Sequence, residues 1–184
     1  FFNANNYGLI KQKDEELSIK FYLAILNSSI IWFFIKNISS ELRGGFFQYS
    51  PTYLELISFP TTDNENIFIQ KADLMLELNK KLQELKQNFH NELNLEKLTN
   101  KLQKFEELEF DDFIKEYTKS KKIKFADKLE ERNFKNDWKA LFENDKKEVL
   151  EIQNQINITD KEIDQMVYKL YDLTPDEIKI IEGN

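Results

Sequence analysis

Hydrophobic residues change their spacing at Pro60, and this change divides the chain into two parts. Before Pro60 they form dense runs that are separated by serine, glycine and proline. After it they recur at intervals of three and four, and neither glycine nor proline occurs between Thr61 and Asp172. Because such intervals are typical of packed helices, the pattern predicts a compact unit over residues 1–60 and a helical scaffold over residues 61–184.

The first part mixes strand-like and helix-like segments, which predicts a small α+β unit. Asp14 has the chemistry of a helix N-cap, and Pro51 suits the first position of a helix. Aromatic residues such as Phe46 and Phe47 favour strands. The predicted elements are a strand and turn over 1–13, a helix from Asp14 to Leu26, a break at 27–29, an apolar helix over 30–36, a strand over 46–49, a short turn or helix from Ser50-Pro51 and a strand over 57–60.

Two stripes of apolar residues predict a long antiparallel helical hairpin in the second part. The first stripe spans Ile67–Phe89 and the second spans Leu95–Phe105. Long apolar stripes that follow each other along a chain are typical of helices that pack side by side. Residues 109–157 are less regular, and we expect them to form shorter helices that fold back over this hairpin.

Two sequence segments near the C-terminal end match the capping box, a motif that marks the start of a helix. In this motif an N-cap threonine and a glutamate three residues later each satisfy a free backbone N–H group. Thr159 and Glu162 match the motif, and so do Thr174 and Glu177, with Pro175 at the first helical position. The pattern predicts two C-terminal helices joined by a tight turn.

Paired glycines beside an isolated arginine mark the candidate binding loop. Adjacent glycines adopt positive φ values and let the backbone approach a partner closely. They are therefore suited to present a neighbouring side chain to a ligand. The candidate residues of this loop are Ser39, Ser40, Arg43, Gly44, Gly45 and Gln48.

The polar side chains of this loop suit contacts with double-stranded DNA. Arginine donates two hydrogen bonds to guanine O6 and N7, and glutamine pairs with adenine in the same way. Arg43 and Gln48 are therefore the base readers in this hypothesis, and the hydroxyls of Ser39 and Ser40 suit phosphates or base edges. The alternative for Arg43 is a surface salt bridge with Glu41.

Composition and charge limit these interpretations. The chain has 184 residues, of which 41% are hydrophobic and 14% aromatic, and this is enough for a folded core. Its net charge is −7, which by itself argues against a nucleic-acid partner. The charges within residues 1–60 balance, however, so the whole acidic excess lies in residues 61–184. The net charge therefore does not exclude DNA binding by the first part.

One basic window interrupts the acidic part. Lysines occupy positions 119, 121, 122, 124 and 128, and only Asp127 adds a negative charge among them. Ammonium groups this close together neutralise phosphates and add affinity that does not depend on sequence. Lys121 and Lys122 are therefore candidates for contacts with the DNA backbone. The alternative is a solvated connection between two helices.

The sequence carries no recognisable catalytic or metal centre. His90 is the single histidine, without cysteine partners for zinc or an arrangement typical of nucleophilic catalysis. No glycine-rich loop follows a predicted strand, so we expect no nucleotide or S-adenosylmethionine site. There is no cysteine, and no apolar run is long enough to cross a bilayer. We therefore expect a cytoplasmic location, no membrane partner and no catalysis by this chain alone.

Four short segments occur in an order that is informative as a whole. They are Leu26-Asn27-Ser28, Ser39-Ser40-Glu41-Leu42-Arg43-Gly44-Gly45, Ser50-Pro51-Thr52-Tyr53-Leu54 and Ile57-Ser58-Phe59-Pro60. Their order resembles the C-terminal target-recognition domain of Type IIG restriction-modification enzymes, which join a DNA methyltransferase and an endonuclease in one polypeptide. Residues 163–178 are similar to the closing helices of that family. One departure is Asp172, where the family pattern usually has glycine.

The resemblance implies that the chain is part of a larger enzyme and recognises double-stranded DNA. Residues 1–60 would form the C-terminal part of the recognition domain, and residues 61–184 a helical spacer that ends in a helix pair. The methyltransferase and endonuclease domains of the parent would methylate adenine and cleave DNA, with S-adenosylmethionine and magnesium bound there. The acidic excess and the leucine stripes favour a second hypothesis, a helical interaction module that packs against another domain or chain.

Overall fold

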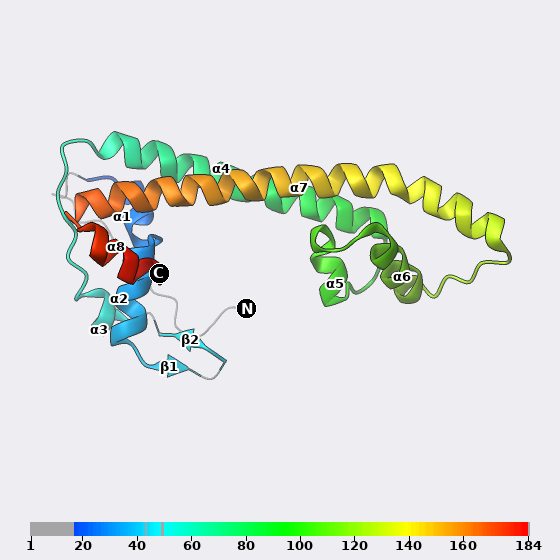
Figure 1. The fold of residues 1–184 in the computed structure, drawn as a ribbon, viewed down its shortest axis with the longest axis horizontal. Coiled ribbons are helices and arrows are strands. Elements are labelled where there is room, and N and C mark those ends of the chain that lie inside the picture. The colour runs from blue at the N-terminus through cyan, green and yellow to red at the C-terminus, as the bar shows by residue number, and fades with distance from the viewer. Residues whose placement is uncertain (1–16, 43, 49, 184) are drawn as a thin grey trace. The chain divides into compact units, whose positions relative to one another are not determined.

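The computed structural model describes residues 17–42, 44–48 and 50–183, which belong to two compact units. Unit 1 comprises the described residues up to Met75 together with those from Ile158 onward, and unit 2 comprises Leu76–Asn157. Helices dominate the described residues, and the two strands found there form one sheet (Figure 1). The predicted fold class, helix-rich α+β with a long helical hairpin, is confirmed.

Two long helices, α4 and α7, each contribute residues to both units. The described elements in chain order are α1 (Ile19–Leu26), α2 (Ser29–Ile38), β1 (Glu41–Leu42), β2 (Phe46–Phe47), α3 (Pro51–Leu54), α4 (Glu65–Leu93), α5 (Asn100–Gln103), the 3-10 turn η1 (Phe105–Glu107), α6 (Phe110–Lys121), α7 (Lys128–Leu170) and α8 (Pro175–Glu182).

Serines open the two N-terminal helices. The Ser18 side chain is the N-cap of α1 and accepts a hydrogen bond from the backbone N–H of Lys20 at 3.3 Å. Ser28 is the N-cap residue of α2, so the predicted break and restart are confirmed. The predicted helix start at Asp14 is wrong, because Ser18 is extended and α1 begins after it. Asp14 itself lies outside the described residues.

The segment between α2 and α4 is only partly as predicted. Phe46 and Phe47 form a strand, and Pro51 opens α3 at its first position. The strand predicted over 57–60 is absent from the structure, since Ile57 is 9% exposed and packs into a helical core with no described strand beside it. The strand and turn predicted over 1–13, and Tyr49, lie outside the described residues.

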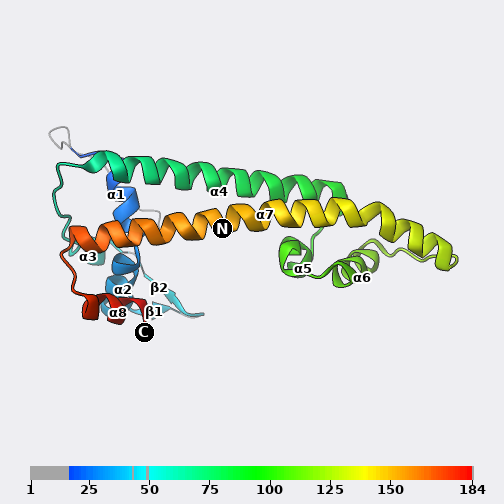
Figure 2. The same cartoon turned by 45° about the horizontal axis from the view of Figure 1, so that its top comes forward.

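The core of unit 1 joins helices that are far apart in sequence. Its buried residues are Phe21, Ala24, Ile25, Ile31, Ile35, Ile57, Phe68, Ala72, Ile163 and Val167. Apart from Ile57, which follows α3, they come from α1, α2, the start of α4 and the end of α7, which lie side by side (Figures 1 and 2). Each fully buried large side chain contributes about 1.5–3 kcal/mol, so the two ends of the described chain stabilise each other.

The core of unit 2 is rich in aromatic residues. Its buried residues are Phe89, Leu93, Leu102, Phe105, Phe113, Ile114, Tyr117, Phe142 and Val149. Phe113 is central, since its ring lies near those of Phe89, Tyr117, Trp138 and Phe142, and it stacks on Phe142 with 4.6 Å between centroids. The unit therefore has a core of its own, built from α4, α5, η1, α6 and α7.

The second arm of the helical hairpin is α7, and the arm predicted over Leu95–Phe105 is wrong. Asn94 has a left-handed backbone with φ of 46°, which ends α4. The stripe after it is split between an irregular segment, α5 and η1, and its Leu102 and Phe105 are fully buried in the core of unit 2. The short helices predicted over 109–157 are wrong for α7, which is continuous for 43 residues.

One of the two predicted capping boxes forms. Thr174 and Glu177 exchange both hydrogen bonds of the motif at the start of α8. Thr159 caps no helix, because it is 4% exposed within α7, where no glycine or proline interrupts the helix. The predicted tight turn between the last two helices is confirmed: Asp172 has φ of 52°, and the N–H of Leu173 donates to the carbonyl of Tyr168 at 3.0 Å.

Candidate nucleic-acid interface

A short β-hairpin extends from the C-terminal end of α2 in unit 1. Its strands pair antiparallel, with Glu41 opposite Phe47 and Leu42 opposite Phe46. The hairpin lies beyond α2, on the side away from α4 and α7 (Figures 1 and 2). Gly44 and Gly45 form its turn with φ of 98° and 79°. Both values lie in the region that favours glycine, so the predicted positive φ at the paired glycines is confirmed.

The helix that carries the hairpin is anchored on its other face. Ile31 is 3% exposed and Ile35 is fully buried in the core of unit 1. At the start of α2, both carboxylate oxygens of Asp164 accept hydrogen bonds from Ser29, one from its backbone N–H at 2.7 Å and one from its hydroxyl at 2.6 Å. Such N-terminal capping contributes about 1 kcal/mol. A residue of α7 thus fixes the support of the hairpin.

Two contacts join the hairpin to this support. The Ser39 hydroxyl accepts a hydrogen bond from the backbone N–H of Gln48 at 3.2 Å. The ring of Phe47 meets that of Trp32 edge to face, with 5.3 Å between centroids. Edge-to-face aromatic pairs contribute about 0.5–1.5 kcal/mol beyond their buried area. The base of the hairpin is therefore held on α2, and Gly44 and Gly45 of its turn are exposed.

The residues predicted for the loop divide into three groups. Ser40, Gly44, Gly45 and Gln48 are exposed around the hairpin. Ser39 is half-buried, and its hydroxyl serves the hairpin itself. Arg43 lies outside the described residues. The predicted base reader Gln48 and the paired glycines are thus brought together on one exposed element.

The two predicted lysines lie in unit 2 and have different surroundings. The Lys121 ammonium donates to the carbonyls of Leu93 at 3.1 Å and Asn94 at 2.7 Å. Lys121 therefore caps the C-terminal end of α4, where a positive charge is favourable. Lys122 ends α6 with φ of 58° and is exposed. Only Lys122 of the pair has an ammonium without a hydrogen bond or ion pair to the described residues.

His90 is engaged within the fold of unit 2. Its Nε2 lies 3.1 Å from the carbonyl oxygen of Leu102, to which the Nε2–H tautomer donates. Burial lowers the pKa of His90 from its ordinary value, and the nearby Lys86 ammonium adds to this effect. Within the described residues, no three histidine, aspartate or glutamate side chains are grouped so that they could hold a metal ion.

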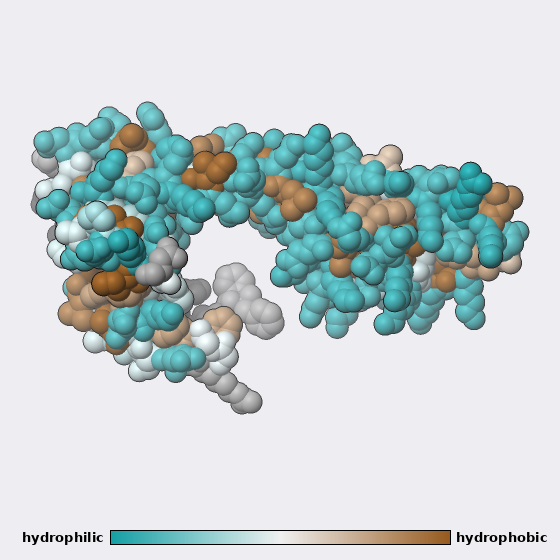
Figure 3. Space-filling view, viewed as in Figure 1, coloured by the Kyte–Doolittle hydropathy of each residue, from teal (hydrophilic) through white to brown (hydrophobic). Residues whose placement is uncertain are grey.

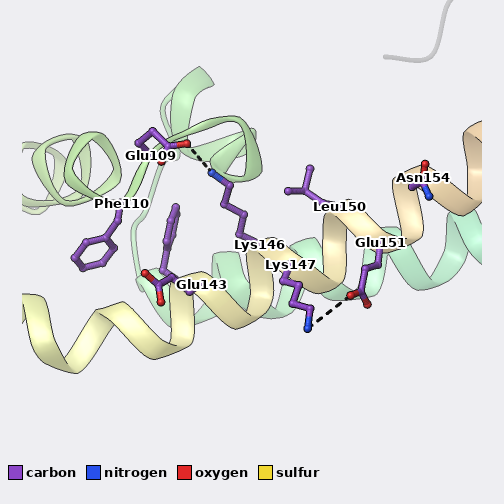
Figure 4. Close-up of a pocket in the computed structure, with 9 residues that line it drawn as sticks. Glu109, Phe110, Glu143, Lys146, Lys147, Leu150, Glu151 and Asn154 are labelled. Atoms are coloured by element: carbon purple, nitrogen blue, oxygen red, sulfur yellow. Dashed lines mark hydrogen bonds and ion pairs between the residues drawn. The ribbon is translucent and has the colours of Figure 1, made fainter.

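A surface cleft of about 480 Å³ lies between the start of α6 and α7 in unit 2 (Figure 4). The Lys146 ammonium donates to the carbonyl of Leu108 at 2.6 Å and pairs with Glu109 at 3.2 Å. Lys147 pairs with Glu151 at 3.8 Å. Since both lysines already have partners within the chain, the cleft is a weaker candidate for ligand binding than the hairpin.

The visible surface differs between the units. Hydrophilic residues cover most of unit 2, whereas apolar and weakly polar residues gather around α2 and α3 in unit 1 (Figure 3). Among the helices described here, no single one has the length and apolar composition needed to cross a membrane. The helices α1 and α2 meet that criterion only as a pair, with a bend of 63° between them.

Two residues of this region have structural features that were not predicted from the sequence. Asp164 was given no role, although it caps α2 from a position 135 residues away. An aspartate on a predicted helix carries no signal of such a distant contact. Phe46 was predicted only as a strand residue, yet it is 69% exposed. The signal for Phe46 was its position directly after the glycines.

Comparison with protein families gives two matches. Residues 1–60 match the TaqI-like C-terminal specificity domain. This match and the exposed hairpin support a restriction-enzyme C-terminal specificity domain in the first third of the chain. Residues 61–167 match a domain of unknown function, DUF8810, and because this match covers more than half of the chain, the chain belongs to that family. Searches of curated proteins and of solved structures give no significant match.

Proposed function

We propose that this chain is the sequence-recognition module of a restriction-modification enzyme of the Type IIG kind and that the hairpin over residues 39–48 reads double-stranded DNA. The observation that carries the proposal is an exposed turn of two glycines on an anchored helix, within the segment that matches the specificity domain. Adenine methylation and cleavage are the work of other domains of the parent enzyme, which bind S-adenosylmethionine and magnesium ions.

The shape of the hairpin suits the major groove. Two paired strands lie about 4.8 Å apart, and the major groove, about 12 Å wide, admits a two-stranded ribbon. Gln48 is exposed at the base of the hairpin, and Arg43 directly precedes the glycines. In this proposal Arg43 contacts guanine, Gln48 contacts adenine and Ser40 contacts a phosphate. A hairpin held on α2 loses little freedom on binding, which favours affinity.

The basic window supplies contacts with the DNA backbone in this proposal. Lys122 and its neighbours Lys119 and Lys124 are exposed. Each phosphate contact makes the slope of log affinity against log salt concentration steeper by about 0.9. Lys121 has a structural role instead, since its ammonium binds the end of α4. Replacing Lys122 with alanine should therefore reduce the salt slope by about 0.9, and replacing Lys121 should mainly destabilise unit 2.

Sequencing of modified bases tests base recognition. The parent enzyme and its variants Arg43→Ala and Gln48→Ala would be expressed in a host without adenine methylation, and methylated adenines mapped across its genome. A bidentate base contact contributes about 1–3 kcal/mol of discrimination. We expect each variant to relax one position of the target motif, because one base is no longer distinguished from the other three.

The control is Lys36→Ala, which removes an exposed positive charge from α2 in the same unit. It should leave the motif unchanged. If Arg43→Ala and Gln48→Ala methylate the same motif as the unaltered enzyme, with the same efficiency at each position, the hairpin does not read bases and the proposal fails.

Exposed leucines favour a second candidate function for unit 2. Leu76 is 51% exposed, Leu129 63% and Leu150 43%. They are consistent with a helical interaction module that packs against another domain of the parent enzyme. A salt titration with cognate and random duplexes separates the two functions: a recognition module shows a salt slope and a preference for the cognate duplex, whereas a packing module binds neither.

A further inference from the structure

Phe46 is the most exposed of the large hydrophobic residues that the structure describes. It is 69% exposed, whereas its neighbour Phe47 is half-buried. An isolated apolar residue at a surface is common and needs no explanation. Phe46 differs because it follows Gly44 and Gly45 directly, at the turn that projects from unit 1.

The two faces of the hairpin have different environments. Side chains of successive strand residues point to opposite faces. Phe47 faces α2, where its ring contacts Trp32. Phe46 therefore points away from α2. One face holds the hairpin on the protein, and the other presents an aromatic ring to the surroundings.

The Phe46 ring lies next to the turn. A Cβ atom added to Gly44 would lie 3.2 Å from the Cε2 atom of Phe46 and 3.4 Å from its Cδ2 atom. The ring therefore packs against the backbone of Gly44, which has no side chain to displace it. An exposed aromatic ring suits a contact with an apolar group on a ligand.

We infer that Phe46 recognises a thymine by packing against its C5-methyl group in the major groove. This inference rests on the proposed function, which places the hairpin in that groove. The methyl group is the apolar feature that distinguishes thymine there, and phenylalanine is among the residues that contact it. Every target that contains adenine also contains thymine on the complementary strand, so a partner for Phe46 is always present.

Replacing thymine by deoxyuridine tests this contact, because the exchange removes only the methyl group. Affinities of the parent enzyme would be measured without magnesium for the cognate duplex and for duplexes with deoxyuridine at one thymine at a time. Burial of a methyl group corresponds to about a fourfold change in affinity. We expect the unaltered enzyme to lose about fourfold at one position and Phe46→Ala to lose nothing there.

Two further variants make the result specific. Leu56→Ala removes another exposed hydrophobic residue of unit 1, which is 63% exposed, and should keep the full dependence on the methyl group. Phe46→Leu retains an apolar side chain and should keep part of the dependence on the methyl group. This variant can be measured even if Phe46→Ala binds weakly.

The possible failures are distinguishable. If no deoxyuridine substitution weakens the unaltered enzyme, or if Phe46→Ala is as sensitive as the unaltered enzyme, Phe46 does not recognise a methyl group. If Phe46→Ala loses affinity equally for all duplexes, the ring inserts elsewhere and the inference is also overturned. If the unaltered enzyme shows no preference for its cognate duplex, the proposed function itself fails.

Discussion

The two units differ in where their core residues come from. The core of unit 1 combines residues of the specificity-domain segment, such as Ile25 and Ile35, with Phe68 and Ile163 from the segment after residue 60. The core of unit 2 comes entirely from Leu76–Asn157. The boundary between the two family matches is therefore not a boundary in folding, because the core of unit 1 includes residues of α4 and α7.

Polar contacts join distant parts of the chain in both units. In unit 1 the backbone N–H of Ser18 donates to Glu65 at 2.7 Å, and the Tyr171 hydroxyl donates to the carbonyl of Ser58 at 2.7 Å. These pairs are separated by 47 and 113 residues. In unit 2 the hydrogen bond from the Gln153 side chain to Glu106 spans 47 residues. The Tyr171–Ser58 contact of unit 1 thus joins a longer stretch of the chain than this contact of unit 2.

The largest predicted effect comes from removing one buried phenylalanine in each unit. Phe21 and Phe113 are both fully buried, and replacing either by alanine should cost about 3–5 kcal/mol. Phe21→Ala should abolish DNA recognition, because it loosens the support of the hairpin. Phe113→Ala should destabilise unit 2 and leave the target motif unchanged. Amide hydrogen exchange by segment and methylation mapping measure the two effects.

Phe113→Ala could instead lose the target motif while the amides of unit 1 stay protected. That result would contradict the separate roles of the two units, because base recognition would then depend on residues outside unit 1.

A smaller loss is expected when the cap of α2 is removed. Asp164→Ala leaves two donors of Ser29 without partners, so the free energy of unfolding should fall by about 1–3 kcal/mol. The matched control is Asp160→Asn on the same helix. Burial and the charge of Asp164 raise the pKa of Asp160, so ionisation is less favourable in the folded chain. Asp160→Asn should therefore not destabilise unit 1 at neutral pH, as thermal unfolding can verify.

If both substitutions lower the unfolding temperature equally, the contact between Asp164 and Ser29 does not account for the stability of unit 1.

The sequence predicts local elements well and distant contacts poorly. Ser28, Pro51 and Thr174 mark helix starts because capping depends on neighbouring residues. The sequence predicts the wrong partner helix for α4. The leucines over 95–102 have the spacing of one helix, although the structure divides this segment between an irregular stretch and the short helix α5. Asn94 ends α4 in a left-handed turn, and asparagine gives a weaker signal than glycine.

Replacing Asp172 with glycine should produce a small stabilisation. Asp172 lies in the left-handed region with φ of 52°, where a residue with a Cβ atom is strained. It occupies the position where the family resemblance would place glycine. Asp172→Gly should raise the free energy of unfolding by about 0.5–1 kcal/mol, measured by denaturant titration. A decrease would show that the Asp172 side chain stabilises the turn.

The smallest effect is a pH dependence confined to unit 2. Since burial lowers the pKa of His90 below 6.5, the unfolded chain binds a proton more readily than the folded chain. The contribution of neutral His90 is complete above pH 6.5 and is lost as the pH falls below that value toward the folded pKa. His90→Gln, which keeps a donor near Leu102, should remove this dependence. Amide exchange of unit 2 between pH 7.5 and 5.5 would reveal it, and an equal dependence in both proteins would refute it.

The sequence predicts the residue types of the candidate site but not the contacts that hold them in place. Gly44 and Gly45 indicated the turn because few residues other than glycine adopt their φ values. Phe47 is half-buried and Phe46 exposed because the hairpin contacts Trp32 with the face that carries Phe47. No local sequence pattern determines that contact. Lys121 looked like a phosphate ligand because sequence alone does not show that its ammonium meets the end of α4.

The proposed contact between the hairpin and DNA is tested most directly by amide hydrogen exchange of the parent enzyme, with and without its cognate duplex. We expect slower exchange over residues 39–48 with the cognate duplex and a smaller change with a random duplex of equal length. Unchanged exchange over these residues, with protection elsewhere in the chain, would contradict the proposed contact.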